Sequence, residues 1–298
     1  MRARARRGSP DPERAEGRES PADLAAGAGP ARHVSLEWDE RGGVTVHMDG
    51  SPQSHVQPDD PTVLVFEYVQ HLALVLDALT PGPPAPLAVT HVGGAGLTLP
   101  RYVEATRPGS PQIVLEPDAA LTALVREQVP LPRRHRIRVR PVDGLTGIAA
   151  LRDASAGVVV TDAYAGGRVP GELVGATYAT QLARVLGPGG VALWNLADEP
   201  GLRWVSRVVA TVRDVLPEVA LVATHEVLKR RRFGNVVLVA SSTPLPIDRL
   251  RRDVARAALP TGLRVGDDLG RLCAGAKPFG DNGTHSPVPP DASGWRVV

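Results

Sequence analysis

The sequence predicts an α/β fold with a mainly parallel sheet. From residue 87 onward, short apolar runs typical of buried strands alternate with segments whose apolar residues recur at helical spacing. Alternating strands and helices imply crossover connections, which make neighbouring strands parallel. Only "LKRRRFG" separates the last two predicted strands, which is too short for a crossover helix, so we expect these two strands to pair antiparallel.

A mainly parallel sheet with an antiparallel final strand is typical of class I methyltransferase-like, or Rossmann-like, domains. We place this domain at residues 85–260, after the linker "TPGPPAP", and interpret residues 261–298 as a C-terminal extension. Its strands are predicted in "LAVTHV", "QIVLE", "IRVRPV", "GVVVT", "VALWNL", "VALVATHEV" and "NVVLVAS". Its helices are predicted in "LTLPRYVEAT", "DAALTALVREQV", "GELVGATYATQLARVL" and "PGLRWVSRVVATVRDVL".

The N-terminal part is predicted to hold a disordered tail and a small β element. Residues 1–32 are mainly Arg, Gly, Pro, Ala and Glu, which cannot bury enough surface to offset the entropy of ordering. An over-early start codon and a basic nucleic-acid-binding arm are the alternatives. Within residues 33–80, "VSLEW" and "VTVHM" flank the turn "DERGG" and predict a β-hairpin. "SPQSHVQPDDPT" then predicts a loop, and "VLVFEYVQHLALVLDAL" predicts a helix.

The composition narrows the classes of partner. A net charge of +2 gives no overall field that would favour nucleic acid or a membrane, and no apolar run is long enough to span a bilayer. No apolar stretch follows the first arginines, so we expect no signal peptide. The single Cys273 excludes an intramolecular disulfide and a multi-cysteine zinc site, and it fits a cytoplasmic protein. The histidines lack metal-ligand spacing, so we expect no metal.

Ligands of such sheets bind beyond the carboxyl ends of the strands, where the sequence places a glycine turn and an acid. The turn "GGAG" contributes Gly93, Gly94 and Gly96, which let the backbone approach a ligand, although glycine turns after strands are also common. Glu116 closes the next strand and could accept both hydroxyls of a ribose. The alternative is a helix cap, for which Asp118 is the better candidate.

Two further acids lie at strand ends. Asp143, followed by Gly144, could accept from the exocyclic amine of an adenine, and an ordinary Asp-Gly turn is the alternative. Asp162 ends "GVVVT", where a carboxylate could take a proton from an amine. A helix cap is the alternative there, but the following helix is predicted to start near Gly171, too far away for Asp162 to cap it.

The order of these pieces resembles the spermidine synthase (polyamine aminopropyltransferase) family, in particular the spermidine synthase-like proteins of high-GC bacteria. The resemblance covers about residues 49–282. It rests on "VGGAGLTL" for the family's "GGGDGGTL", "VLEPD" for the ribose-binding acid, "VDG" for "GDG", "TDAYAG" for "DSSDP", "DGSPQ" for "DGxxQ", "FEYVQ" for "FxYHE" and "AKPFGDN" near the C-terminus.

The resemblance implies a chemistry and a set of roles. The amine of putrescine would attack the aminopropyl carbon of decarboxylated S-adenosylmethionine, and methylthioadenosine would leave. Asp162 would be the catalytic residue that deprotonates or orients the amine. The co-substrate would contact the glycine turn, Glu116 and the pair Asp143 and Gly144. The acceptor would contact Gln53, Tyr68 and Tyr164.

The departures from the family pattern concern the diamine half of the site. The acid inside the glycine segment is Ala95 here, the second acid of the "DSSDP" stretch is Ala165, and the residue after the family's Tyr is Val69. A buried ammonium without a carboxylate partner costs several kcal/mol, so we expect putrescine to bind poorly. The N-terminal β element also looks shorter than in true synthases, so a homodimer is expected only as one possible assembly.

Three functions therefore remain open at this point. The first is a spermidine synthase-like transferase that moves an aminopropyl group to a small-molecule amine. The second is a methyltransferase that uses S-adenosylmethionine itself, because the loss of the acid at Ala95 makes the pocket less selective for the decarboxylated form. The third is a catalytically silent binding protein that keeps the fold.

Overall fold

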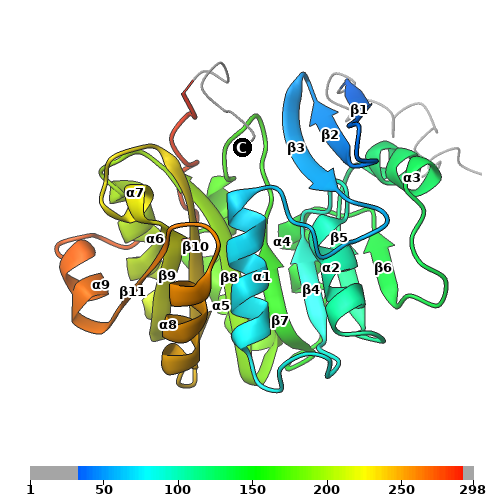
Figure 1. Cartoon of the computed structure of the whole chain (residues 1–298). Helices are drawn as coiled ribbons and strands as arrows, with labels where there is room; N and C mark the ends of the chain where they lie inside the picture. Colours follow the sequence, from blue (N-terminus) through cyan, green and yellow to red (C-terminus); the bar gives the residue numbers. More distant parts are fainter. Residues whose placement is uncertain (1–32, 291–298) are drawn as a thin grey trace, which may run out of the picture. The chain divides into compact units, whose positions relative to one another are not determined.

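A three-stranded antiparallel sheet forms the first part of the chain that the computed structural model describes, which comprises residues 33–290. Strands β1 (Val34–Trp38) and β2 (Val44–Met48) form the predicted hairpin. The loop prediction was wrong for Ser51–Val56, which forms a third strand, β3, paired with β2 (Figure 1). The first half of this strand, "SPQ", has no apolar residue typical of a strand, and its extended conformation depends on pairing with β2. The tail predicted at residues 1–32 lies outside the described residues.

An eight-stranded sheet forms the centre of the fold, in the order β11-β9-β10-β8-β7-β4-β5-β6. Strands β6, β5, β4, β7 and β8 run parallel, whereas β10 is antiparallel to both β8 and β9. The methyltransferase-like arrangement is thereby confirmed. The strands are β4 (Val89–Val92), β5 (Gln112–Leu115), β6 (Ile137–Arg140), β7 (Ala156–Thr161), β8 (Leu186–Asp198), β9 (Glu218–Thr224), β10 (Gly234–Ser241) and β11 (Thr261–Val265).

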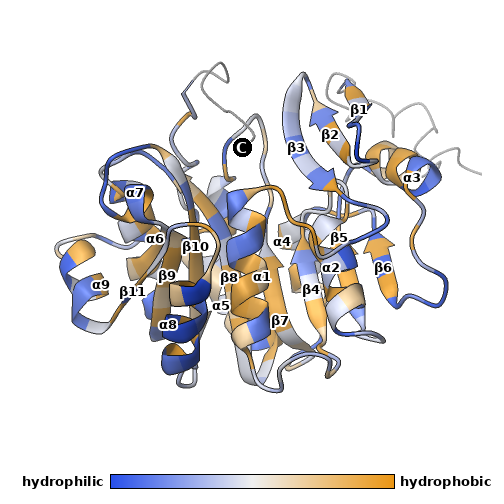
Figure 2. Ribbon diagram, in the orientation of Figure 1, coloured by the Kyte–Doolittle hydropathy of each residue, from blue (hydrophilic) through white to orange (hydrophobic). Residues whose placement is uncertain are grey.

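Helices cover both faces of this sheet, and each face has its own apolar core. One core contains residues of α5 and α6, and the other contains residues of α1, α2 and α8. Figure 2 shows apolar residues along the strands and along α1, whereas α8 is mostly hydrophilic. The helices are α1 (Glu67–Ala78), α2 (Thr98–Thr106), α3 (Ala119–Gln128), α4 (Gly144–Ala149), α5 (Ala176–Val185), α6 (Arg203–Arg213), α7 (His225–Leu228), α8 (Ile247–Arg256) and α9 (Gly266–Leu272).

The structure differs from the predicted elements in two places that bear on the site. The helix expected to start near Gly171 starts at Ala176, and a short 3-10 turn occupies Gly171–Leu173. The segment 261–298, expected as an extension, begins with the edge strand β11, which pairs with β9 in the main sheet. The sequence "TGLRV" contains a glycine and only two large apolar residues, so it is not identified as a strand without its pairing to β9.

The segment Phe279–Ser286, which we call the C-terminal strap, fastens the loop between β7 and α5. The Ser286 backbone N–H donates to the Val169 carbonyl over 3.1 Å, and the Val169 N–H donates to Ser286 Oγ over 2.9 Å. The Gly283 N–H donates to the Gly171 carbonyl over 3.1 Å. These bonds hold the loop that follows Asp162 at Val169 and at Gly171.

Candidate functional site

The glycine turn after β4 is packed against the ends of two other strands. Gly93 has a φ of +92°, and its N–H donates to the Leu115 carbonyl over 2.9 Å. A Cβ atom on Gly93 would overlap the main-chain oxygen of Asp162, so only glycine lets β4 and β7 end side by side here. The Gly94 N–H donates to Glu116 Oε2 over 2.9 Å. The turn, Glu116 and Asp162 therefore lie together, as the sequence predicted.

Glu116 holds the turn through its carboxylate. Oε2 also lies 3.3 Å from the Ala95 N–H, and Oε1 accepts from the Asp118 N–H over 3.0 Å. Asp118 itself caps α3, accepting from the Leu121 N–H over 2.8 Å, as expected from the sequence. The role of Glu116 toward a ribose stays a prediction, and its position beside the turn is the one that this role requires.

Gly96 has a different function from its neighbours in the turn. It is buried, and its N–H donates to Ser54 Oγ on β3 over 2.9 Å. A Cβ atom there would lie 2.5 Å from the same Ser54 oxygen. Gly96 therefore allows the small sheet to lie against the turn, and this packing accounts for the glycine without a ligand.

Asp143 caps a helix that the sequence analysis did not identify. Its Oδ1 accepts from the Thr146 N–H over 2.9 Å at the start of α4. This backbone hydrogen bond lowers the pKa of Asp143 below its ordinary value. Gly144 packs against Val92, whose Cγ1 a Cβ atom would overlap. The Asp-Gly turn accounts for both residues in the structure, and contact with an adenine stays a prediction.

Asp162 directly follows β7 and belongs to a network of polar side chains. Asn195 of β8 donates from Nδ2 to Asp162 Oδ1 over 2.9 Å. Asn235 of β10 donates from Nδ2 to Asn195 Oδ1 over 2.9 Å and to Tyr164 Oη over 3.1 Å. Tyr164 Oη donates to the Asn195 carbonyl over 3.2 Å. These bonds join the segment after β7 to the neighbouring strands β8 and β10.

The environment of Asp162 favours its neutral form. Burial raises its pKa to about 6, although the hydrogen bond from Asn195 acts in the opposite direction. The phenols of Tyr68 and Tyr164 face this carboxylate, and burial raises both of their pKa values well above the ordinary value. Asp162 therefore exchanges its proton near neutrality while both phenols stay neutral, which suits a group that takes a proton from an amine.

Tyr68 joins α1 to the small sheet. Its hydroxyl donates to the Gln53 carbonyl over 3.3 Å, and its ring stacks on Phe66 with centroids 6.0 Å apart. The Gln53 amide donates to the Ser51 carbonyl over 3.4 Å, so it is the main chain of Gln53 that Tyr68 contacts. Val69 is buried in the apolar core of the α1 face.

Asn195 and Asn235 are the site residues that the sequence analysis missed. Each is a single amide in an otherwise apolar strand, "VALWNL" or "NVVLVAS". A buried polar side chain in an apolar strand needs a partner, and this is the signal that could have identified both.

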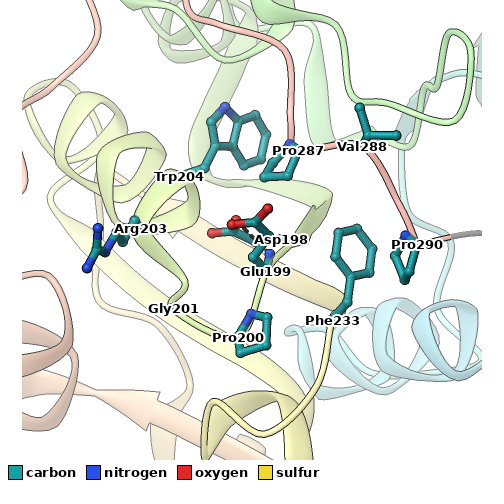
Figure 3. Close-up of a pocket in the computed structure, with 10 residues that line it drawn as sticks. All are labelled: Asp198, Glu199, Pro200, Gly201, Arg203, Trp204, Phe233, Pro287, Val288 and Pro290. Carbon is teal, nitrogen blue, oxygen red and sulfur yellow. Dashed lines mark hydrogen bonds between the residues drawn. The ribbon is translucent and has the colours of Figure 1, made fainter.

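A cavity of about 610 Å³ lies beyond the carboxyl end of β8 (Figure 3). It is lined by Asp198, Glu199, Pro200, Gly201, Arg203, Trp204, Phe233, Pro287, Val288 and Pro290. Asp198 accepts the N–H groups of Glu199 and Val205 over 2.8 and 2.9 Å, so its carboxylate caps the start of α6. The positive end of the helix thus offsets this charge, and Glu199 and Arg203 carry opposite signs, so the lining selects neither cations nor anions.

Two absences bear on the kind of site. Within residues 33–290, no three His, Cys, Asp or Glu side chains are grouped as metal ligands would be. No helix in that range has the length and apolar content needed to cross a membrane.

No family model matches the chain, but the similar sequences and the similar structures agree with each other. A curated relative from Neisseria meningitidis, a polyamine aminopropyltransferase, is 24% identical over 243 residues, which are 78% of this chain and 85% of the relative. A probable spermidine synthase from Corynebacterium glutamicum has a similar structure, with 28% identity and a TM-score of 0.78 over 85% of this chain and 95% of its own. The spermidine synthase of Thermotoga maritima shares the fold at 16% identity, with a TM-score of 0.56 over 83% of this chain and 82% of its own.

Proposed function

Because this chain is spermidine synthase-like in sequence and fold, we propose that it transfers an aminopropyl group from decarboxylated S-adenosylmethionine to a small-molecule amine. The observation that carries this proposal is the position of Asp162. Asp162 directly follows β7, its main chain packs against the glycine turn, and burial raises the pKa of its carboxyl to about 6. The relatives support aminopropyl transfer for the family, and the acceptor of this chain is a separate question.

In the proposed reaction, the amine nitrogen forms a bond to the aminopropyl carbon while the carbon–sulfur bond breaks. Methylthioadenosine leaves with the electron pair of that bond, as a neutral thioether. The nitrogen gives up a proton to Asp162, because only a neutral amine is a nucleophile. A carboxylate with a pKa of about 6 can accept this proton at neutral pH and release it to water afterwards.

The acceptor that fits best carries a single amine. Positions 95 and 165 hold alanine, so neither supplies a carboxylate for a second ammonium group. Ala165 is exposed, and the Arg168 side chain, two residues beyond the neighbouring turn glycine, donates to the Ser286 carbonyl, so this loop offers no carboxylate at position 165. Leaving an ammonium unpaired in a partly buried site costs several kcal/mol. We therefore propose a monoamine, or an amine whose far end is uncharged, in place of putrescine.

A methyltransferase that uses S-adenosylmethionine is the second candidate, and one observation favours it. Ala95 has a φ of +37° in the glycine turn and puts a methyl group where the resemblance expects an acid. An acid at this position would repel the carboxylate of S-adenosylmethionine, and Ala95 does not.

Product analysis by mass spectrometry tests the proposal. Purified protein is incubated with decarboxylated S-adenosylmethionine and either monoamines or diamines. We expect methylthioadenosine together with an aminopropylated monoamine, and much less product from putrescine. S-adenosylhomocysteine formed from S-adenosylmethionine and an acceptor would favour the methyltransferase instead. Neither product with any amine would overturn the proposed transfer.

A further inference from the structure

While Asp162 is ionised, the hydrogen bonds around it have only one consistent direction, because a carboxylate can accept but not donate. The NH2 group of Asn235 donates to Asn195 Oδ1 and to Tyr164 Oη. Asn195 Oδ1 is therefore an acceptor, and its NH2 group must be the end that faces Asp162 Oδ1. The Tyr164 hydroxyl gives its proton to the Asn195 carbonyl, which leaves its oxygen free to accept. Each donor and acceptor thus specifies the next one.

This direction has a consequence for the two oxygens of Asp162. Oδ1 faces an amide NH2, which donates and cannot accept. A proton placed on Oδ1 would point at that donor and abolish the 2.9 Å hydrogen bond. A proton on Oδ2 leaves the bond intact. The two oxygens are therefore chemically different before any substrate binds.

We propose that Asn235 is a positioning residue that acts through Asn195 to keep Asp162 Oδ1 as a fixed acceptor and to leave Oδ2 as the oxygen that takes the proton. The catalytic part of this inference rests on the proposed function, whereas the orientation of the amides does not. Asn235 bonds Asp162 only through Asn195, which distinguishes it from a catalytic residue.

The placement of the two amides supports this role. In the β8–β10 register, Asn195 is opposite Val237 and Asn235 is opposite Ala197, so the two amides are diagonal neighbours across the pair of strands. Diagonal side chains on one face of a sheet are within reach of each other. Amides among apolar strand residues are unfavourable unless they are hydrogen-bonded, and this network provides the bonds.

Asn235→Asp keeps the shape of the side chain, removes the NH2 donor and adds a negative charge, which by itself raises the pKa of Asp162. The new carboxylate can only accept, so the Asn195 amide must turn its NH2 group toward residue 235 and its Oδ1 toward Asp162. A protonated Asp162 can then donate a hydrogen bond to Asn195 Oδ1, so the pKa of Asp162 rises. The titratable groups that face Asp162 are the Tyr68 and Tyr164 phenols, which stay neutral in the range tested.

The pKa of Asp162 would be measured by carboxyl 13C NMR in the wild-type protein, in Asn235→Asp and in the matched control Asn282→Asp, an exposed site. We expect an upward shift of about one pH unit in Asn235→Asp and none in the control, with a parallel move of the acid limb of kcat/KM. Asn235→Leu removes the donor without adding charge, and we expect a smaller shift in the same direction. It also provides the test if Asn235→Asp does not fold.

The readouts separate this inference from the proposed function. An unchanged Asp162 titration in Asn235→Leu would overturn the positioning role, whatever the activity, because a shift seen in Asn235→Asp alone would come from its added charge. A loss of kcat that is equal at every pH, with the titration unchanged, would do the same, because it would indicate a structural effect. If the wild-type protein makes no methylthioadenosine, the proposed function fails while the NMR titration still decides whether Asn235 orients Asp162.

Discussion

Gly93 packs so closely against the main chain of Asp162 that a Cβ atom on it would lie 2.0 Å from the Asp162 main-chain oxygen. The glycine turn, predicted to approach the nucleoside, is thus in direct contact with the main chain of Asp162, at a Gly93 φ of +92°. We predict that Gly93→Ala lowers the free energy of unfolding by more than about 3 kcal/mol, because the overlap adds to the backbone strain. Urea denaturation measures this change.

Gly109→Ala is the control for that variant. Gly109 also has a positive φ, of +79°, but a Cβ atom there would have nothing within 4 Å. It should cost only the left-handed backbone strain, about 1 kcal/mol. Equal losses in the two variants would show that the contact with Asp162 contributes nothing.

Asp162→Asn should abolish transfer and leave nucleoside affinity almost unchanged. We expect methylthioadenosine formation to fall by a factor of about 100 or more, because the amide cannot take the proton. In the wild-type protein, kcat/KM should rise as the pH rises through about 6, since the ionised form is the active one. Full activity in the variant, measured beside calorimetric binding of methylthioadenosine, would remove Asp162 from the mechanism.

The same variant should change stability in a pH-dependent way. Since the pKa of Asp162 in the fold, about 6, exceeds its ordinary value of 3.8, its contribution to stability is fully present below pH 3.8 and is lost as the pH rises through 6. Asp162→Asn avoids this loss, so it should be more stable than the wild type by about 2 kcal/mol at pH 8 and by less at pH 4.5. Urea denaturation at the two pH values checks the sign.

Glu116→Ala should weaken methylthioadenosine binding by a factor of about ten or more. The carboxylate holds the turn through Gly94 and Ala95, and it is the predicted partner of the ribose hydroxyls. Asp118→Ala is the control, because that side chain only caps α3 and should lower stability alone. Isothermal titration calorimetry distinguishes the two, and equal affinities would refute the ribose role.

Ala95→Asp should restore preference for the decarboxylated co-substrate. Aspartate tolerates a positive φ better than most residues, so the turn at +37° can accept it. We expect the ratio of affinities for decarboxylated over ordinary S-adenosylmethionine to rise about tenfold, through pairing with the aminopropyl ammonium. Ala95→Asn, which has the same shape without the charge, should leave that ratio unchanged in competition binding.

The parallel sheet and the position of Asp162 could be predicted because both depend on local pattern. An apolar run of strand length that ends on an acid identifies a residue at the carboxyl edge of the sheet. Strand β3 could not be predicted, because "SPQSHV" owes its conformation to pairing with β2. Asn195 and Asn235 are 40 residues apart in the sequence, and only the adjacency of β8 and β10 reveals that they bond to each other.

The C-terminal strap also has a consequence for how the protein is made. Val169 and its anchor Ser286 are 117 residues apart. At ordinary translation rates of about 5–20 residues per second, Ser286 is synthesised roughly 5–25 seconds after Val169. Throughout this interval the nascent chain contains the glycine turn and Asp162 but not the C-terminal strap that fastens the loop after them. The structure around Asp162 is therefore completed in two stages, and the rate of translation determines the interval between them.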